Sequence, residues 1–501
     1  MFTANRMMYP TVAALLVLAS GAAADVLQVP ATYPTIQAAI DVAAAGDTIE
    51  VGPGTYRESV DWTGKDLTIV GAGAGLSIID AGLERGGPGG ACVIATELTS
   101  ASRLEGFTLT GGSTLRYYSS DDDMWVVTRL GSGITAINTT MTIASCTMSG
   151  NECQGGYRLD YSSVWSGGDG IRAIGGAPTV IGCTIDDNMG SGVASVLNDG
   201  SAATFVDCGF TRPPWAHMLN TNTPAAGVSL VRCTMVGGGG GIQHTGGSLN
   251  MTNCTLRGLQ TQFGRGIWFS GTDLVATGCL FADNHNTLTD ISRLADVSGV
   301  VIRMFGGRGT VTNCTFANNS GGLWGAAILA SDCVVSNSIF MENRSISGGL
   351  SHMAGAVTAS WCNVQGGYAG VGNIDADPLF VNALSGDYAI DSSSPCIDAG
   401  NNTLVAPTLL TDINGQPRFV DVLSVTDTGV GAAPVVDIGA FEVQGGRCPA
   451  DYNNDGAVDG DDVIAFFEDW DNGYFSADFN RDESVDGDDV IEFFGHWDAG
   501  C

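Results

Sequence analysis

Apolar side chains recur at regular intervals through the middle of the chain, each time in the same short context. Each copy starts with a cysteine, replaced once by Ser338, and has a bulky apolar residue two positions later. The cysteines stand at 146, 183, 208, 233, 254, 279, 314 and 362, and the bulky residues are Met148, Ile185, Phe210, Met235, Leu256, Phe281, Phe316, Phe340 and Val364. Because alternate residues of a strand share one face, the pattern predicts a strand from which both residues point inward.

Two further positions repeat in phase with the cysteine. An asparagine follows it by five residues, at Asn151, Asn188, Asn284, Asn319 and Asn343. Asparagine tolerates a left-handed turn and can stack on its copy in the next coil. A glycine precedes the cysteine position by thirteen residues and starts a second predicted strand, at Gly133, Gly170, Gly241, Gly266 and Gly325. One coil therefore has at least two inward strands and about 21–25 residues.

Units of this length bury their apolar faces only by stacking on one another. The predicted fold is all-β, a right-handed parallel β-helix solenoid, with a small α-helical calcium-binding domain after it. The repeats resemble the pectin-lyase-like family. Residues 33–58 resemble the opening of pectin methylesterase-like proteins, which implies a short capping helix followed by the first strand. A cap is needed because an open solenoid end is an exposed sheet edge.

The repeated cysteines are expected to form a reduced interior ladder. Residues that recur once per coil lie about 4.8 Å apart and point in the same direction, which disfavours disulfides between them. Pairing of Cys146 with Cys153, or of Cys92 with Cys333, stays open at this stage. His244 is expected to point outward from its strand.

Composition and charge indicate an exported protein. Residues 1–24 combine Arg6, an apolar run and the small-residue site at 22–24, and predict a signal peptide cleaved before Asp25. No later apolar run is long enough to span a bilayer, so no transmembrane segment is expected after cleavage. The formal net charge of −33 argues against nucleic acid as a partner. Secretion, or attachment to a cell surface, is the predicted location.

Much of that charge lies in two acidic strings near the C-terminus, which offer oxygen ligands at alternate positions. Calcium takes six to eight oxygens and prefers such a loop, with an acid at position 12. Positions 1, 3, 5, 7, 9 and 12 are Asp451, Asn453, Asp455, Ala457 (through its carbonyl), Asp459 and Asp462 in the first string, and Asp478, Asn480, Asp482, Ser484, Asp486 and Asp489 in the second. Gly456 provides the sharp turn of the first loop. Glu483 replaces it in the second, so the second calcium site is predicted to be weaker.

Each string precedes a short amphipathic helical pattern, 463–467 and 490–494. This repeat, with aspartate at position 12, resembles the dockerin type I module of secreted, surface-assembled bacterial proteins. The resemblance covers residues 447–501 and implies a cohesin-like or other surface docking protein as partner. Contact residues would flank position 12, at 460–461 and 487–488. Cys448 and Cys501 could form a disulfide across the module.

Residues 373–446 contain strings such as 394–400, 412–418 and 437–442 that look like the C-terminal segment of anchored bacterial β-helix proteins. We therefore expect four parts: a signal peptide (1–24), the β-helix with its N-terminal cap (25–372), a closing segment and linker (373–446), and the dockerin-like domain (447–501).

Two insertions interrupt the repeat, at residues 112–130 and 153–168, and both are rich in aromatic and acidic residues. They lie between the same two strands of successive coils, so they are expected to project from one edge of the solenoid. Aromatic rings stack on sugar faces, and carboxylates accept hydroxyl protons. The predicted polysaccharide-binding residues are Tyr117, Tyr118, Asp122, Trp125, Tyr157, Tyr161 and Trp165. Loops that merely pack their own aromatics are the alternative.

Catalytic signals are weak. Pectate lyases use acids to hold calcium and an arginine to abstract a proton from the substrate. By resemblance to them, Asp169, Asp186 and Asp187 could hold calcium and Arg172 could abstract the proton, with the four residues on adjacent coils. The Gly-His-Gly of polygalacturonases is missing from the chain. The sequence favours a non-catalytic β-helix protein that binds extracellular polysaccharide or mediates adhesion. A polysaccharide lyase or glycoside hydrolase acting in polysaccharide catabolism remains the alternative.

Overall fold

The computed structural model describes residues 24–82, 90–113, 115–119, 124–129, 132–153, 156–157, 163–164, 170–190, 194–211, 217–223, 227–261, 266–286, 301–321, 327–345, 347–422, 425–444, 450–453, 458–480 and 484–499. Side chains are not described at 115–119, 124–129, 153, 156–157, 163–164, 189–190, 194–199, 217, 223, 261, 286, 498 and 499. No described helix is long and apolar enough to cross a membrane.

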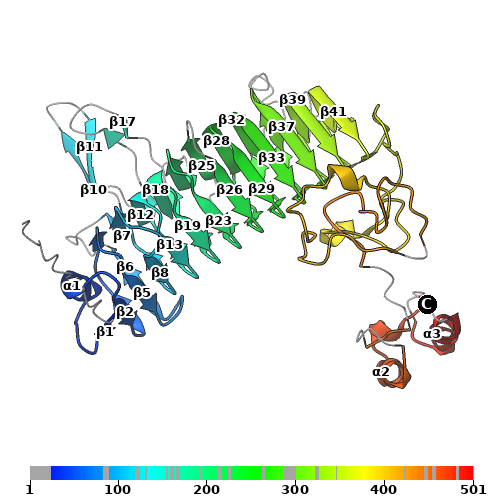
Figure 1. The fold of residues 1–501 in the computed structure, drawn as a ribbon, viewed down its shortest axis with the longest axis horizontal. Helices are drawn as coiled ribbons and strands as arrows, with labels where there is room; N and C mark the ends of the chain where they lie inside the picture. The colour runs from blue at the N-terminus through cyan, green and yellow to red at the C-terminus, as the bar shows by residue number, and fades with distance from the viewer. Residues whose placement is uncertain are drawn as a thin grey trace, which may run out of the picture.

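The body is a stack of coils whose strands form three parallel ladders (Figure 1). The first ladder consists of β4 (Val60–Thr63), β7 (Ala91–Thr96), β12 (Ser132–Thr139), β18 (Ile171–Gly176), β22 (Ala194–Asp199), β25 (His217–Thr223), β28 (Gly240–Gly246), β32 (Ile267–Gly271), β36 (Ile302–Met304), β39 (Ile328–Ser336) and β41 (Met353–Ser360).

The second ladder follows the first in each coil and joins it at β39. Its other strands are β1 (Val26–Val29), β2 (Thr48–Val51), β5 (Thr68–Gly71), β8 (Arg103–Glu105), β13 (Thr142–Ala144), β19 (Thr179–Ile181), β23 (Thr204–Val206), β26 (Val228–Val231), β29 (Leu249–Thr252), β33 (Asp273–Thr277) and β37 (Arg308–Thr312).

The third ladder is a separate sheet that carries the bulky apolar residues of the repeat. It consists of β3 (Gly54–Tyr56), β6 (Ser77–Asp80), β9 (Thr108–Thr110), β14 (Thr147–Ser149), β20 (Thr184–Asp186), β24 (Gly209–Thr211), β27 (Thr234–Val236), β30 (Thr255–Arg257), β34 (Leu280–Ala282), β38 (Thr315–Ala317), β40 (Ile339–Met341) and β42 (Asn363–Val364). The sequence predicted at least two strands per coil, and the coil has three.

The cysteine ladder is confirmed as a column of buried thiols, with one correction. Each cysteine stands at the corner before the third strand rather than inside it. The preceding residue is left-handed, as at Asn253 (φ 51°) and Asn313 (φ 51°). Cysteines of consecutive coils are hydrogen-bonded: the backbone N–H of Cys254 donates to the Cys279 Sγ at 3.4 Å. Ser338 continues the column, because its Oγ accepts the Cys314 N–H at 3.0 Å.

The cysteines of the solenoid whose side chains the structure describes are free and buried. The alternative pairings of Cys146 with Cys153 and of Cys92 with Cys333 were therefore wrong. The thiols of Cys92 and Cys146 instead donate to the carbonyls of Thr110 and Ala144. Cys448 and Cys501 lie outside the described residues.

The repeated asparagines stack inside the turn after the third strand. The side-chain amide of Asn319 donates to the Asn343 Oδ1 at 2.7 Å and to the Phe281 carbonyl at 2.9 Å, and Asn284 donates to Asn319 at 2.9 Å. The left-handed conformation predicted for asparagine belongs to the residue before it, such as Asn318 (φ 52°). The ladder is interrupted between Asn188 and Asn284, where the described coils have Gly238 and the buried Leu259 at this position.

Apolar columns fill the interior beside these polar ones. Phe281, Phe316 and Phe340 stack with ring centroids 4.7 Å apart, the spacing of parallel strands. Glycine is required near the start of the first-ladder strand β28, because a Cβ on Gly241 would lie 2.2 Å from the Gly266 carbonyl oxygen of the next coil. The repeated glycine therefore permits close stacking.

A short helix caps the N-terminal end, as expected, but it does not precede the first strand. The helix α1 (Ile36–Val42) buries Ile36 and Ile40 against the first coil. Its first N–H groups donate to the Glu58 carboxylate at 2.9 Å. The strand β1 comes before α1 and pairs with β2, so the helix covers a coil that has already begun.

The C-terminal part of the body, residues 377–444, is called the strap here. After residues 365–376 cover the last coil, the strap turns back along the third ladder (Figure 1). It contains β43 (Phe380–Asn382), η2 (Ala383–Ser385), β44 (Asp387–Ile390) and η3 (Asn402–Leu404). Its apolar residues pack on β34, β38 and β40.

Corner asparagines hold the strap in place. The side chain of Asn253 donates to the Asp412 carbonyl at 2.9 Å, and Asn337 donates to the Asn401 carbonyl at 3.0 Å. Both residues adopt the left-handed conformation required at the corner. Asparagine therefore has two roles here: it allows the backbone to turn at the corner of the coil, and its side chain binds the strap.

His244 points inward, which corrects the expectation that it faces outward. It is fully buried in β28 and stacks on Phe269 with ring centroids 5.2 Å apart. Its Nε2 donates to the Gly247 carbonyl at 3.0 Å, and its Nδ1 accepts from the Thr221 hydroxyl at 2.5 Å. Burial lowers the pKa of His244, so the ring is held in the neutral form.

The asparagine ladder generates a stability prediction. Asn319→Ala should lower the free energy of unfolding by roughly 2–4 kcal/mol, because the buried partners of its amide lose their hydrogen bonds. Asn250→Ala, an outward residue of β29, is the control. Urea unfolding followed by circular dichroism measures both. Equal midpoints for the two variants would contradict a structural role for the ladder.

The buried imidazole predicts a pH effect. Below the ordinary histidine pKa of about 6.5 the unfolded chain gains a proton that folded His244 excludes, so stability falls by about 1 kcal/mol per pH unit. His244→Gln should remove this contribution. Burial raises the pKa of Asp437 and Glu442, so these two acids stabilise the folded state as the pH falls, opposite to His244. The pH slope of stability in the variant is therefore compared with that of wild type.

Denaturation midpoints between pH 7.5 and 5.5 measure the two slopes. Gln243→Ala, its outward neighbour on β28, should keep the wild-type slope. An unchanged slope in His244→Gln would show that the ring titrates in the folded protein as it does in the unfolded chain.

Candidate functional site

The acidic tail folds into two helices whose first turns are organised by the predicted ligand residues. The helices are α2 (Gly460–Asp471) and α3 (Gly487–Ala499), separated by η4 (Phe475–Ala477). Asp459 is the N-cap of α2 and accepts from the Asp461 N–H at 2.9 Å. Acidic side chains in the first turn also interact favourably with the helix dipole.

The two position-12 acids, Asp462 and Asp489, make equivalent hydrogen bonds. Asp462 accepts the backbone N–H of Asn453 at 3.0 Å and of Asp459 at 2.9 Å. Asp489 accepts the N–H of Asn480 at 3.1 Å and of Asp486 at 2.8 Å. Both are fully buried. In each repeat the position-12 carboxylate therefore joins positions 3 and 9 of its loop.

The remaining ligand positions are only partly described. Asp451, Asp478 and Ser484 are described, whereas Asp455, Ala457 and Asp482 lie outside the described residues. The described acids of either loop do not by themselves gather into a group of three converging carboxylates.

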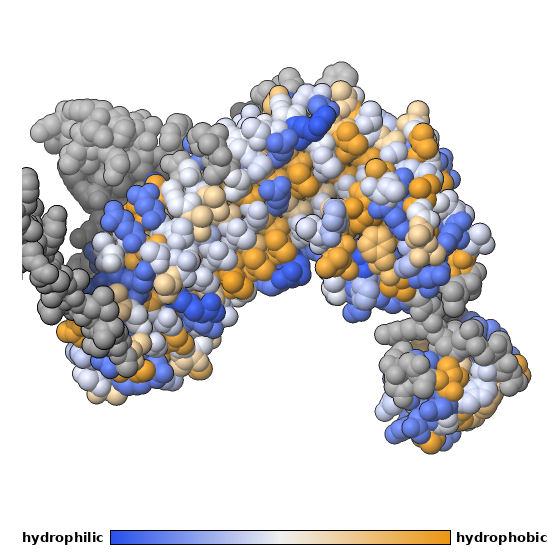
Figure 2. Space-filling view, viewed as in Figure 1, coloured by the Kyte–Doolittle hydropathy of each residue, from blue (hydrophilic) through white to orange (hydrophobic). Residues whose placement is uncertain are grey.

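Aromatic packing joins the two repeats into one small core. The rings of Phe466 and Phe493 are parallel, with centroids 4.3 Å apart, and Phe479 contacts both. On the outside, Ile464 and Ile491 occupy equivalent positions of the two helices and are 65% and 70% exposed. Figure 2 shows apolar patches on the visible face of this part of the molecule.

The two aromatic-rich insertions leave the same edge of the solenoid, as the sequence predicted, and they also pair with each other, which it did not predict. They form a four-stranded sheet of β10 (Leu115–Ser119), β11 (Met124–Arg129), β16 (Gly156–Tyr157) and β17 (Ser163–Val164) (Figure 1). The first insertion connects β9 to β12 and the second connects β14 to β18, so both leave the solenoid between the third and first ladders. Short pairs extend this edge: β15 (Glu152–Cys153) with β21 (Met189–Gly190), and β31 (Gln260–Thr261) with β35 (His285–Asn286).

The backbone register brings several predicted sugar-binding positions together. Tyr118 pairs with Trp125, while Tyr117 and Tyr157 both pair with Val126. Asp122, Tyr161 and Trp165 lie outside the described residues.

The catalytic candidates do not converge. Arg172 lies on β18 of the first ladder, whereas Asp186 lies on β20 of the third. They belong to one coil rather than to adjacent coils, and they face different sides of it. Asp186 accepts from the Thr211 hydroxyl, and Asp187 is an exposed left-handed turn residue. Asp169 lies outside the described residues. The described geometry provides no common site for this set.

Two features of the strap escaped the sequence interpretation. A cleft of about 410 Å³ separates part of the strap from the third ladder, lined by Asn318, Glu342, Asp377, Phe380 and Tyr388 among others. The hydroxyl of the lining residue Tyr388 donates to Asp283 at 2.5 Å, and Arg257 donates to the same carboxylate at 2.9 Å. The second feature is a group of three acids around Asp398. Both depend on contacts between distant segments, for which the repeat pattern contains no signal.

The comparisons with known proteins agree with the fold. The family model described as a right handed beta helix region matches residues 216–383. Together with the parallel ladders it identifies the body as a right-handed β-helix. No curated protein matches the chain.

Solved structures similar to the chain include pectate lyase Pel9A, at 14% identity, covering 81% of this chain and 90% of the other with a TM-score of 0.40. The family 28 exopolygalacturonase of Yersinia enterocolitica is 12% identical, with coverages of 68% and 78% and a TM-score of 0.35. The AlgE6 A-module, a mannuronan C-5 epimerase of Azotobacter vinelandii, is 15% identical, with coverages of 68% and 94% and a TM-score of 0.30. At these values no activity is transferred to this chain.

Proposed function

We propose that the chain is a secreted or surface-docked β-helix protein that binds extracellular polysaccharide and is attached through a calcium-dependent, dockerin-like tail. The observation that carries the proposal is the equivalence of the two buried acids Asp462 and Asp489, which make matching hydrogen bonds in two repeats. The export signal predicted from residues 1–24 fits an oxidising, calcium-rich environment.

Calcium is the ion that suits these loops. A carboxylate oxygen has two lone pairs, so the oxygens of Asp462 that accept backbone N–H groups retain capacity for a cation. The other predicted ligands are carboxylate, amide or carbonyl oxygens, which hard cations prefer. Without a cation, the acids of one loop repel one another. We therefore infer that calcium binding and folding of the tail are coupled.

The two sites should differ in affinity. Glu483 stands at the turn position that Gly456 occupies in the first loop. A side chain at that position opposes the tight turn of a calcium loop. The second site is therefore proposed to be the weaker one.

The exposed isoleucines support a docking role. Ile464 and Ile491 stand 27 residues apart, at equivalent points of the two repeats, and each follows the position-12 acid by two residues. Large exposed apolar residues at repeated positions suit contact with another protein. The proposed partner is a cohesin-like or other surface docking protein, reached once calcium has fixed the two helices.

The inserted sheet is the proposed polysaccharide surface. Its backbone aligns Tyr118 with Trp125 and brings Tyr157 next to the same hairpin. Aromatic rings are large, rigid apolar contacts with specific geometry, which suits them to the apolar faces of sugar rings.

A polysaccharide lyase or glycoside hydrolase is the second candidate, favoured by the resemblance of the repeats to the pectin-lyase-like family. The separation of Arg172 from Asp186 on two ladders weighs against the catalytic set suggested by the sequence. We therefore rank binding above catalysis.

Calcium dependence of the tail is tested with the full-length chain. Asp451→Ala combined with Asp478→Ala removes the position-1 ligand of both loops and should abolish the gain in helical circular dichroism that calcium produces in wild type. Glu468→Ala combined with Asp471→Ala removes the same charge from exposed positions of α2 and should retain the response. A chelator that leaves the wild-type spectrum unchanged would contradict the proposal.

The polysaccharide proposal is tested by affinity electrophoresis on uronate and neutral polysaccharides. Tyr118→Ala with Trp125→Ala should weaken retardation by roughly tenfold or more, since stacked aromatic contacts carry such binding. Trp268→Ala, on the first ladder away from the inserted sheet, is the control. Equal retardation of all three proteins would locate binding elsewhere.

The same polysaccharides are incubated with wild type and assayed for unsaturated products and reducing ends, with and without calcium. The binding-protein proposal expects neither product. Turnover that is lost in Arg172→Ala would establish the enzymatic alternative instead.

A further inference from the structure

One acid of the strap differs from the others in its surroundings. Asp412, Asp437 and Glu442 are buried, and each accepts backbone N–H groups: Asp412 from Gln416 at 2.9 Å, Asp437 from Asp398 at 2.8 Å and Glu442 from its own neighbour Asp437 at 3.1 Å. Arg418 lies against this group and donates to the Asp437 carbonyl at 2.9 Å. The carboxylates of these three acids therefore have hydrogen-bond partners within the strap, which gives them a structural role.

Asp398 is fully buried as well, but neither oxygen of its carboxylate has a hydrogen-bond partner of ordinary geometry among the described residues. Buried carboxylates are normally hydrogen-bonded, paired with a cation or bound to a metal. Asp398 therefore requires a partner that the neighbouring described residues do not supply.

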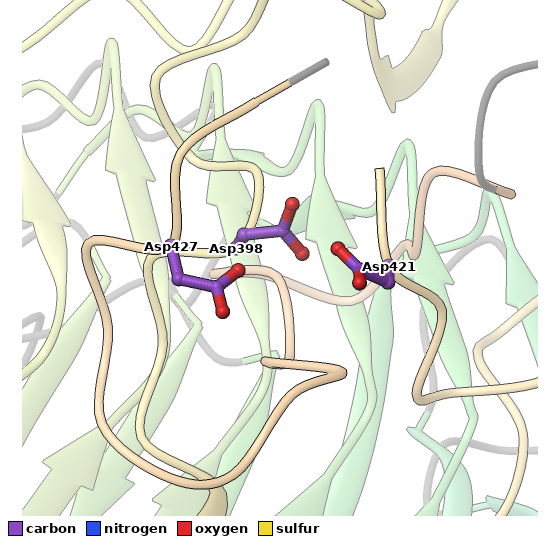
Figure 3. Close-up of side chains that lie close together, drawn as sticks. All are labelled: Asp398, Asp421 and Asp427. Carbon is purple, nitrogen blue, oxygen red and sulfur yellow. The ribbon is translucent and has the colours of Figure 1, made fainter. Parts of the chain in front are cut away.

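The Asp398 carboxylate faces that of Asp421, and Asp427, another acid of the strap, turns its carboxylate toward the same space (Figure 3). One ligand oxygen from each of Asp398, Asp421 and Asp427 can be chosen so that all three lie within 4.8 Å of one another. Asp421 is half-buried and Asp427 is exposed, so solvent reaches the group at Asp427. Three carboxylates at this separation repel one another unless a cation lies between them.

The backbone holds Asp398 rigidly in this position. It adopts a left-handed conformation (φ 50°), its N–H donates to the Asp437 carboxylate, and its carbonyl accepts from Thr428 and Gly429 at 3.0 Å each. The pKa of Asp398 is raised to about 6, mainly by burial and further by the charges of Asp427 and Asp421, while the Val422 backbone acts in the opposite sense. The unfavourable environment is therefore built into the fold.

We propose that Asp398, Asp421 and Asp427 bind a hard divalent cation, of which calcium is the best fit. All three ligands are carboxylates, with no histidine or cysteine that would favour zinc or copper. Calcium–oxygen distances of about 2.3–2.6 Å place ligands on opposite sides of an ion up to about 5 Å apart, which matches the spacing of this group. Waters on the side of Asp427 would complete the six to eight oxygens that calcium takes.

The cation would brace the strap against the solenoid. Asp398 is three residues from Asn401, whose N–H and carbonyl are both hydrogen-bonded to the side chain of Asn337 at a coil corner. Asp421 and Asp427 belong to a later part of the strap, described at residues 421–422 and 425–427 and called the outer loop here. One ion would therefore join the outer loop to the segment that is fixed on the β-helix. This site is independent of the tail.

The site is tested by equilibrium dialysis of the full-length chain with radioactive calcium. To remove the tail as a source of binding, the background carries Asp451→Ala and Asp478→Ala. In that background one ion per chain should remain bound. Adding Asp398→Asn should abolish this binding, and adding Asp427→Asn should weaken it by roughly tenfold or more. Because Asp427 is exposed, its replacement should leave the fold intact.

Asp273→Asn in the same background is the matched control, since Asp273 is an exposed acid of β33, and it should leave the bound ion in place. Binding of no ion by the background protein, or of an ion that persists in both Asp398→Asn and Asp427→Asn, would overturn the proposal. The result does not depend on the proposed function of the tail: if the tail binds no calcium, wild type and background should each bind one ion.

Discussion

The vertical stacking of one coil on the next is the constraint from which the rest of the structure follows. A single coil of this solenoid has three short strands and no core of its own. Its apolar faces are buried only when identical positions of neighbouring coils lie in register at strand spacing. That register stacks the rings of Phe281, Phe316 and Phe340 at 4.7 Å. It also allows the Cys254 backbone N–H to donate to the thiol of Cys279. The asparagines can enter the interior because they repeat too, so that one asparagine finds its partner one coil away.

The register also explains what lies outside the solenoid. Insertions are tolerated between the third and first ladders, where they do not disturb the ladders, and there the two long ones combine into a sheet of their own. Corners between the second and third strands instead present asparagines such as Asn253 and Asn337, whose side chains hold the strap. One edge of the solenoid is thus available for a binding surface, and the adjoining side is covered.

Much of this organisation could be predicted from the sequence, because a repeat states the same preference many times. The inward cysteines, the bulky residue two positions later, the asparagine ladder, the N-terminal helix and both tail helices are all present. The second-ladder strand of each coil, the position of β1 before α1 and the inward direction of His244 were missed or wrong. They depend on contacts with neighbouring coils rather than on local pattern. The group at Asp398 could not be predicted at all, since it unites residues of two separate segments of the strap whose burial only the folded chain determines.

Calcium as the ion that organises the tail is the central claim of the account. Diffraction from crystals of the full-length chain grown with calcium, recorded at long wavelength, tests it most directly through the anomalous signal of the ion. The account predicts one peak inside each tail loop, with the carboxylates of Asp462 and Asp489 among the ligands. Ordered tail loops without such peaks, or with the acids turned away from the loop interior, would contradict it.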